Sequence, residues 1–131
     1  MKKSNELANM EANELRMAKK IRVADLVAVT AFHEDKMIVD VKPLVKREMS
    51  GGYLSPPPIL AVKIANIPQK IQVDGKTAEV KADIKPGDIG IVVYLDLDSD
   101  NSIRTGSESQ PNSTRIHSGD DAIFIGVIRP G

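Results

Sequence analysis

A proline–glycine turn followed by an apolar run constrains the fold of this chain more than any other feature. Pro86 and Gly87 predict a type II turn, because proline presets φ at the second turn position and glycine accepts a positive φ at the third. Residues 89–95 are mostly β-branched and include one glycine, which is typical of a buried or bent strand. A polar excursion over residues 96–120 then leads to a second apolar run at 122–128. This order predicts a small β-barrel, and it contains no catalytic apparatus.

The first half of the chain supplies the remaining strands of such a barrel. Runs with strand composition occupy residues 26–32, 37–45, 59–65, 71–73 and 77–80. Asp74-Gly75 between the last two runs is a strong hairpin signal. Residues 50–58 are rich in glycine and proline and predict a loop, since proline cannot donate to a strand ladder. The expected strands suffice for a closed or nearly closed barrel, an arrangement that hides strand edges.

Composition limits the class of protein. The 131 residues are 41% hydrophobic, which suits one domain core and is too little for two. Lys and Arg number 18 against 18 Asp and Glu, so the chain lacks the basic excess typical of nucleic-acid binders. The absence of cysteine excludes disulfides, thiolate metal sites and a cysteine nucleophile. We expect neither a signal peptide nor a transmembrane segment, because no run approaches the ~18 apolar residues of a membrane span.

The N-terminal residues differ in composition from the rest. Residues 4–20 consist of helix-forming residues without Gly or Pro and predict a helix. We therefore divide the chain into a helical arm, residues 1–22, and a barrel domain, residues 23–131. Apolar residues on about half of the helix surface are the candidate partner-binding residues: Leu7, Met10, Leu15, Met17 and Ile21. Either this face packs on the chain's own barrel or it docks on a neighbouring subunit or hub, because so short a helix is marginal alone.

One acidic segment resembles the start of a calcium-binding loop. Asp96, Asp98 and Asp100 alternate in the way that supplies carboxylate ligands to calcium. However, the sixth position is Asn101 rather than glycine, and the twelfth is Ser107 rather than glutamate. We interpret the segment as a solvated acidic turn and expect no metal site.

The two histidines, His33 and His117, offer little catalytic chemistry. His117 lies near Ser118 and Asp120, so a Ser-His-Asp triad can be considered. Residues so close in an extended segment rarely converge with an oxyanion hole, and we expect His117 to stabilise a turn instead. We therefore expect no catalytic residue and no cofactor, and we expect that the protein is not an enzyme.

A series of short motifs is spread over residues 21–128. In the second half they are Pro86-Gly87-Asp88-x-Gly90, Gln110-Pro111-Asn112, Arg115-x-His117-Ser118 and Asp121-Ala122-Ile123-Phe124. In the first half they are Val39-Asp40-Val41-x-Pro43-Leu44-Val45 and Pro57-Pro58-Ile59-Leu60. In their order and spacing, rather than in any single piece, these motifs resemble the N-terminal domain family of the membrane-piercing spike proteins of tailed phages.

This resemblance implies a fold, an assembly and a location. Members of the family form an oligonucleotide/oligosaccharide-binding (OB) barrel, assemble as homotrimers, and join the spike to the baseplate hub at the tail tip. The implied fold is mainly β, a small Greek-key barrel preceded by an α-helix. The implied location is the virion, at the tail tip or baseplate, after assembly in the host cytoplasm.

The resemblance also leaves a gap. Spikes of the family continue after the barrel into a β-helix with a pointed tip, whereas this sequence ends at Gly131. We expect a structural spike or hub-adaptor protein, of a phage or a phage-like contractile injection particle, that lacks its own tip. Its expected partners are further copies of itself and the baseplate hub protein. Either a separate protein supplies the tip, or the barrel is an adaptor that plugs the hub. The alternative is an OB-type binder of single-stranded nucleic acid or oligosaccharide, but the chain has only two Phe, two Tyr and no Trp for stacking.

Overall fold

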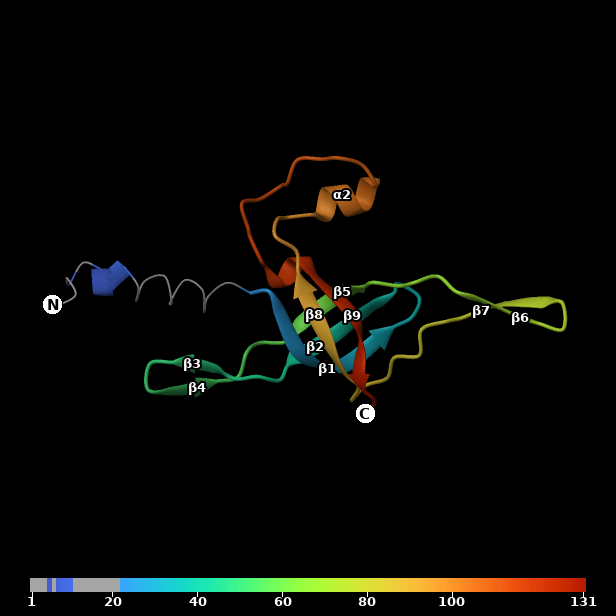
Figure 1. Ribbon diagram of the computed structural model, residues 1–131, viewed down its shortest axis with the longest axis horizontal. Helices are drawn as coiled ribbons and strands as arrows, with labels where there is room; N and C mark the ends of the chain where they lie inside the picture. Colours follow the sequence, from blue (N-terminus) through green and yellow to red (C-terminus); the bar gives the residue numbers. More distant parts are fainter. Residues whose placement is uncertain (1–4, 6, 11–21) are drawn as a thin grey trace.

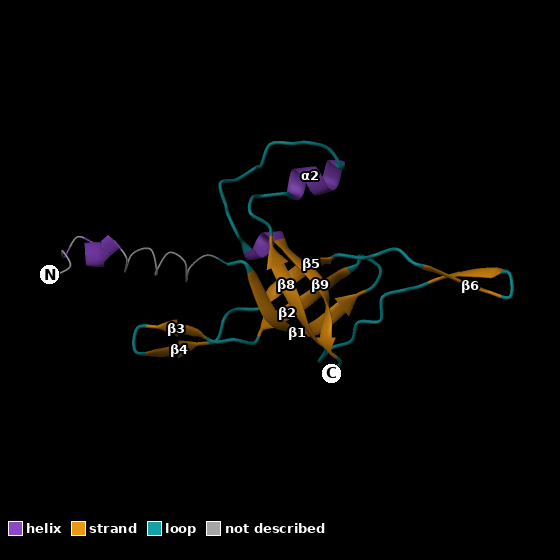
Figure 2. Ribbon diagram, in the orientation of Figure 1, coloured by secondary structure: helices purple, strands orange, loops and turns teal. Residues whose placement is uncertain are grey.

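Five strands close into a barrel in the computed structural model, which describes residues 5, 7–10 and 22–131 (Figures 1 and 2). The barrel strands are β1 (Ala24–His33), β2 (Ile38–Pro43), β5 (Ile59–Ile64), β8 (Ile89–Tyr94) and β9 (Ala122–Arg129). Their order around the barrel is β1-β2-β5-β9-β8, with β5 and β9 parallel and the other neighbours antiparallel. The mainly β, OB-like barrel expected from the sequence is therefore confirmed.

A short helix precedes the barrel, as expected. Residues 5 and 7–10 are helical. The rest of the expected helix, including Leu15, Met17 and Ile21, lies outside the described residues.

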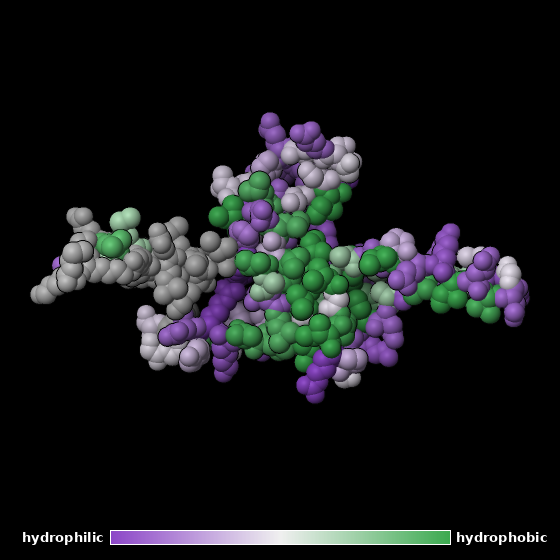
Figure 3. Space-filling view, in the orientation of Figure 1, coloured by the Kyte–Doolittle hydropathy of each residue, from purple (hydrophilic) through white to green (hydrophobic). Residues whose placement is uncertain are grey.

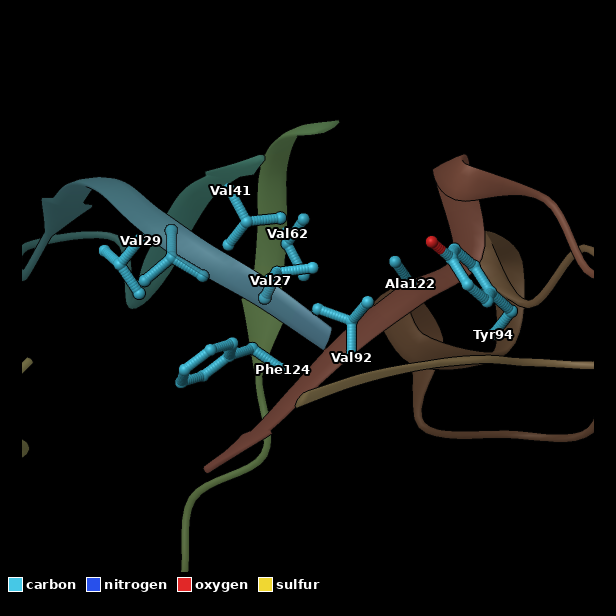
Figure 4. Packing of buried hydrophobic residues seen from close by; sticks show 9 residues of the cluster. Val27, Val29, Val41, Val62, Val92, Tyr94, Ala122 and Phe124 are labelled. Carbon is cyan, nitrogen blue, oxygen red and sulfur yellow. The ribbon is translucent and has the colours of Figure 1, made fainter. Parts of the chain in front are cut away.

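The core of the barrel is rich in valine. Figure 4 shows its buried side chains, which come from all five barrel strands: Val27, Val29, Val39, Val41, Val62, Val92, Tyr94, Ala122 and Phe124. Phe124 is the largest fully buried side chain. It packs against Gly90, where an added Cβ would lie 2.5 Å from the ring Cζ. The glycine within β8 thus makes room for the Phe124 ring in a core made mostly of small side chains.

The turns expected at Pro86-Gly87 and at Asp74-Gly75 are both present. Asp88 N donates to Lys85 O at 3.1 Å, and Gly87 has φ of +94°. Asp74 and Gly75 both have positive φ, +51° and +78°, as a two-residue hairpin turn of type I′ requires.

Two hairpins project from the barrel in opposite directions (Figure 1). One consists of β3 (Arg47–Met49) and β4 (Gly52–Leu54), and the other of β6 (Lys70–Val73) and β7 (Lys76–Glu79). The expectation that residues 50–58 form only a loop was wrong, because Gly51 adopts φ of +83° and turns the chain so that β4 pairs with β3.

The polar excursion between β8 and β9 is partly helical. It contains the helix α2 (Asp100–Thr105) and a single 3₁₀ turn, η1 (Gly119–Asp121). An isolated antiparallel β-bridge between Leu97 and Ile116 joins its two ends. No helix within the described residues is long and apolar enough to cross a membrane.

Candidate functional site

The outer face of three neighbouring barrel strands is apolar. Register places Ala24, Leu26 and Ala28 of β1 beside Val93, Ile91 and Ile89 of β8, and the β9 residues follow on the other side of β8. None of these side chains is fully buried. We call this surface the apolar face, and it consists of Ala24, Leu26, Ala28, Ile89, Ile91, Val93, Ile123, Ile125 and Ile128.

Two irregularities in β9 place further isoleucines on the apolar face. The register against β8 shifts between Ile91 and Val92 and again between Ile89 and Gly90. The extra β9 residues are Ile125 and Ile128, which are 49% and 60% exposed. Figure 3 shows the resulting apolar surface over β8 and β9.

The outer surface of β2 and β5 is mixed. It carries the charged residues Asp40, Lys42 and Lys63, together with Ile38 and the exposed Leu60. Antiparallel strands with one solvated face normally alternate, apolar inside and polar outside. Strands β1, β8 and β9 depart from that alternation, and a contiguous exposed apolar patch marks an interaction site in proteins of this size.

A second feature, beyond the end of the barrel, is a cluster of charged side chains around Arg115. The guanidinium donates through Nε to Asp121 Oδ2 at 2.7 Å, and through Nη2 to Asp98 Oδ1 at 2.8 Å and Asp100 Oδ2 at 2.9 Å. The side chains of Asp98 and Asp121 are each 1% exposed. Ser113 Oγ donates to the other oxygen of Asp98 at 2.9 Å. The cluster ties the excursion loop to the start of α2 and the start of β9.

Electrostatics in this cluster favour the charged forms. Hydrogen bonds from Arg115 hold the pKa of Asp121 below its usual value despite burial. Burial by itself raises the pKa of Asp98, but hydrogen bonds from Ser113 and the Asp100 amide, together with the charge of Arg115, outweigh it and lower that pKa. The same carboxylates raise the pKa of Arg115 through their hydrogen bonds and charge.

The cluster corrects one interpretation of the sequence. The segment from Asp96 to Asp100 is not simply a solvated acidic turn, because Asp98 is buried and paired with Arg115. Carboxylate oxygens of Asp98, Asp100 and Asp121 lie within 4.8 Å of one another, a spacing that could hold a metal ion. The guanidinium of Arg115 already lies among them and supplies the balancing charge, so the arrangement fits a structural ion-pair network.

Neither histidine takes part in a triad. His33 Nε2 lies 3.1 Å from Asp40 Oδ2, whose other oxygen accepts from the Ala61 amide at 2.9 Å. His117 Nε2 lies 3.5 Å from Asp96 Oδ1. Ser118 Oγ accepts from the Asp120 amide and so caps η1.

A hollow of about 840 Å³ lies where the hairpin of β6 and β7 leaves the barrel. Its walls include Phe32, His33 and Met37 from the barrel and Val80 and Ala82 from the root of the hairpin. The wall residue His33 lies 3.1 Å from Asp40 Oδ2 through Nε2.

Of the partner-binding residues predicted from sequence, Leu7 and Met10 are described and are 45% and 60% exposed. Leu15, Met17 and Ile21 lie outside the described residues, so the choice between own-barrel packing and docking stays open. Sequence reasoning did not identify the apolar face. The available signal was that apolar and polar residues do not alternate along 89–95 and 122–128. A strand buried on both sides has the same pattern, so the signal is ambiguous.

No protein-family model matches this chain, and a search of curated proteins finds no significant match. The resemblance to phage spike domains therefore stays a prediction from the sequence motifs.

Proposed function

We propose that the protein is a structural assembly module, a spike or hub-adaptor component at the centre of a phage or phage-like tail tip. The observation that supports it is the apolar face of β1, β8 and β9, on a barrel whose strands β2 and β5 carry charged residues on their outer surface. A face of this kind suits permanent burial against another subunit. The proposed assembly is a homotrimer, because members of the family that the sequence resembles assemble from three copies.

Energetics support burial of this face. An isoleucine side chain moved fully out of water contributes about 1.5 to 3 kcal/mol. Ile125 and Ile128 are about half exposed in the single chain, and they adjoin the partly exposed isoleucines of β8. A subunit contact over the whole face would gain several kcal/mol per chain before the cost of association.

The alternative is an OB-type binder of single-stranded nucleic acid or oligosaccharide, and the structure offers it little support. Such binders use the face of the second and third barrel strands, here β2 and β5, and stack bases on aromatic rings. The four aromatic residues lie elsewhere: Tyr94 and Phe124 are buried, Phe32 packs against the core and Tyr53 is on the β3–β4 hairpin.

The proposal includes the partners that the resemblance implies. These are further copies of the chain and the baseplate hub protein, within the virion after assembly in the host cytoplasm. The role proposed is mechanical and non-catalytic. The Arg115 network serves this role by holding the excursion loop to the barrel.

Sedimentation of the purified chain tests the assembly. We expect an oligomer for the natural sequence and a much lower mass for the double variant Ile125→Lys, Ile128→Lys, with the circular dichroism of the barrel retained. Leu60→Lys is a matched control, because Leu60 is equally apolar and 68% exposed but lies on β5, away from the apolar face. A monomer at micromolar concentration, or equal loss of mass in the control, contradicts the proposal.

A further inference from the structure

The hairpin of β6 and β7 is amphipathic. Residues paired across an antiparallel ladder point to the same side, so Ile71 and Ala78 share a face. Val73 lies two residues after Ile71, and Val80 two residues after Ala78, so both extend this face. Lys76, the partner of Val73, lies on the same face at its turn end. The other side carries only polar residues: Lys70, Gln72, Thr77 and Glu79. Figure 3 shows the hairpin with apolar atoms along one side and polar atoms along the other.

The apolar side of this hairpin is uncovered within the part of the chain that the structure describes. Ile71, Val73 and Val80 are 52%, 60% and 40% exposed, and Ala78 is exposed as well. The hairpin projects away from the barrel (Figure 1). A lone two-stranded hairpin is at best marginally stable in water. An amphipathic hairpin of this kind therefore needs another surface against which its apolar side can pack.

The hairpin and the apolar face match each other in size. Four residues per strand give β6 and β7 a length of roughly 13 Å, at about 3.3 Å per residue. The three strands of the apolar face span roughly 10 Å between the outer two, at about 4.8 Å per strand. Laid across those strands, the hairpin would cover the isoleucines of β8 and β9 that nothing in the described chain covers.

We propose that the β6–β7 hairpin of one copy lies across the apolar face of the next copy, with Ile71, Val73, Ala78 and Val80 facing β8. This inference rests on the proposed homo-oligomer and adds how its subunits are joined. The two surfaces lie at different places on one chain, so in the proposed trimer three copies related by a three-fold axis would join head-to-tail in a closed ring. Each chain then takes part in two such contacts, giving its hairpin to one neighbour and its apolar face to the other.

The chain has no cysteine, so introduced thiols report on this contact without interference. The double variant Val73→Cys, Ile91→Cys carries one thiol on the hairpin and one at the centre of the apolar face. A short bismaleimide should join its copies into covalent oligomers of the sedimenting size. The control Gln72→Cys, Ile91→Cys has its hairpin thiol on the polar side and should cross-link at least about tenfold less, since the neighbouring residue points the other way.

Single variants distinguish the other arrangements. Cross-linking of Val73→Cys alone would show hairpin-to-hairpin contact, and cross-linking of Ile91→Cys alone would show face-to-face contact; either one as the main product overturns the inference. An oligomer in which the double variant gives no cross-link also overturns it while leaving the proposed function intact. A chain that sediments as a monomer overturns both.

A second pair of variants measures the contribution of the hairpin. Ile71→Lys with Val73→Lys should weaken self-association by about tenfold or more. Gln72→Lys with Thr77→Lys places the same charges on the polar side and should leave it unchanged. These hairpin residues are exposed, so the barrel should remain folded in both. Unaltered association of the first variant would contradict the inference.

Discussion

Gly90 is the residue on which the packing of the core depends most directly. A Cβ at this position would lie 2.3 Å from Gly126 O and 2.5 Å from the Phe124 ring. Both neighbours are held in place, the first by the β8–β9 ladder and the second by full burial. No flexible side chain is available to move aside, so the backbone itself would have to shift.

We therefore expect Gly90→Ala to lower the free energy of unfolding by about 1 to 3 kcal/mol, the usual cost of overpacking a core. Gly52→Ala is the control, because Gly52 is also in a strand but an added Cβ there meets nothing within 4 Å. Urea unfolding of both variants measures the difference. Equal stability of the two would show that the Phe124 ring is not held as described.

The ion pairs of Arg115 make the stability of the fold depend on pH. The pKa values of Asp98 and Asp121 are lowered in the folded state. Groups with a lowered folded pKa stabilise the fold above their unfolded pKa of about 3.9 and lose that contribution as the pH falls through the folded pKa. The natural chain should therefore lose stability as the pH falls below about 4.

Arg115→Met should remove much of this pH dependence. Without the guanidinium, the folded pKa values of Asp98 and Asp121 rise, so the variant is less stable than the natural chain at pH 7 and the two converge toward pH 3. Thermal midpoints between pH 3 and pH 7 measure this. Arg104→Met is the control, since Arg104 is exposed and hydrogen-bonds only to Asn101 among the described residues. Parallel pH curves for Arg115→Met and the natural chain would count against the network.

At the scale of elements, the chain carries projecting segments around a rigid barrel. The two hairpins differ in kind. β6–β7 separates apolar from polar residues, whereas β3–β4 pairs Arg47 with Leu54 and Glu48 with Tyr53, and so mixes them on both sides. The N-terminal helix is a third segment, with Leu7 and Met10 exposed one helical turn apart.

Replacement of Leu7 and Met10 by Asp tests the N-terminal helix. If it docks on a neighbouring subunit or hub, the double variant should unfold like the natural chain yet fail to enter particles, because the lost contact lies outside the barrel. Ala8→Asp with Asn9→Asp adds the same charge in the same turn and serves as the control. Reduced barrel stability would instead favour packing on the chain's own barrel, and normal incorporation would refute docking.

At the scale of the whole molecule, the charges balance, whereas the exposed apolar surface is concentrated in two places. The formal net charge is zero, so no overall repulsion opposes the approach of copies. The apolar surface is concentrated on β1, β8 and β9 and on one side of the β6–β7 hairpin. This distribution is compatible with association between copies of the chain.

Self-assembly predicts that thermal stability depends on protein concentration. Binding that involves only the folded state raises the midpoint of unfolding by mass action. We expect the midpoint to rise by several degrees between about 1 and 100 μM, and this rise should vanish in Ile125→Lys, Ile128→Lys. Calorimetry at several concentrations measures it. A midpoint independent of concentration in the natural chain would indicate that the copies do not associate in this range.

Local chemistry in the sequence determined much of the barrel. Pro86-Gly87 and Asp74-Gly75 specify their turns through φ alone, and the apolar runs at 89–95 and 122–128 specify strands. The order of these pieces predicted a small barrel, and the resemblance to phage spike domains implied its OB-like form. The β4 strand was not foreseen, because a glycine-rich segment pairs as a strand only if a partner strand lies beside it.

Only the tertiary structure decided which residues form the surfaces and clusters. Asp98 and Arg115 are 17 residues apart, and their pairing depends on how the excursion returns to the barrel. Likewise, the runs in β8 and β9 are apolar on both faces, and the sequence alone does not reveal what covers the second face. Barrel closure turns one face of each strand to the core, which leaves Ile91 and Ile125 outside. Burial is a property of the folded arrangement, so the apolar face becomes visible only when the strands are in place.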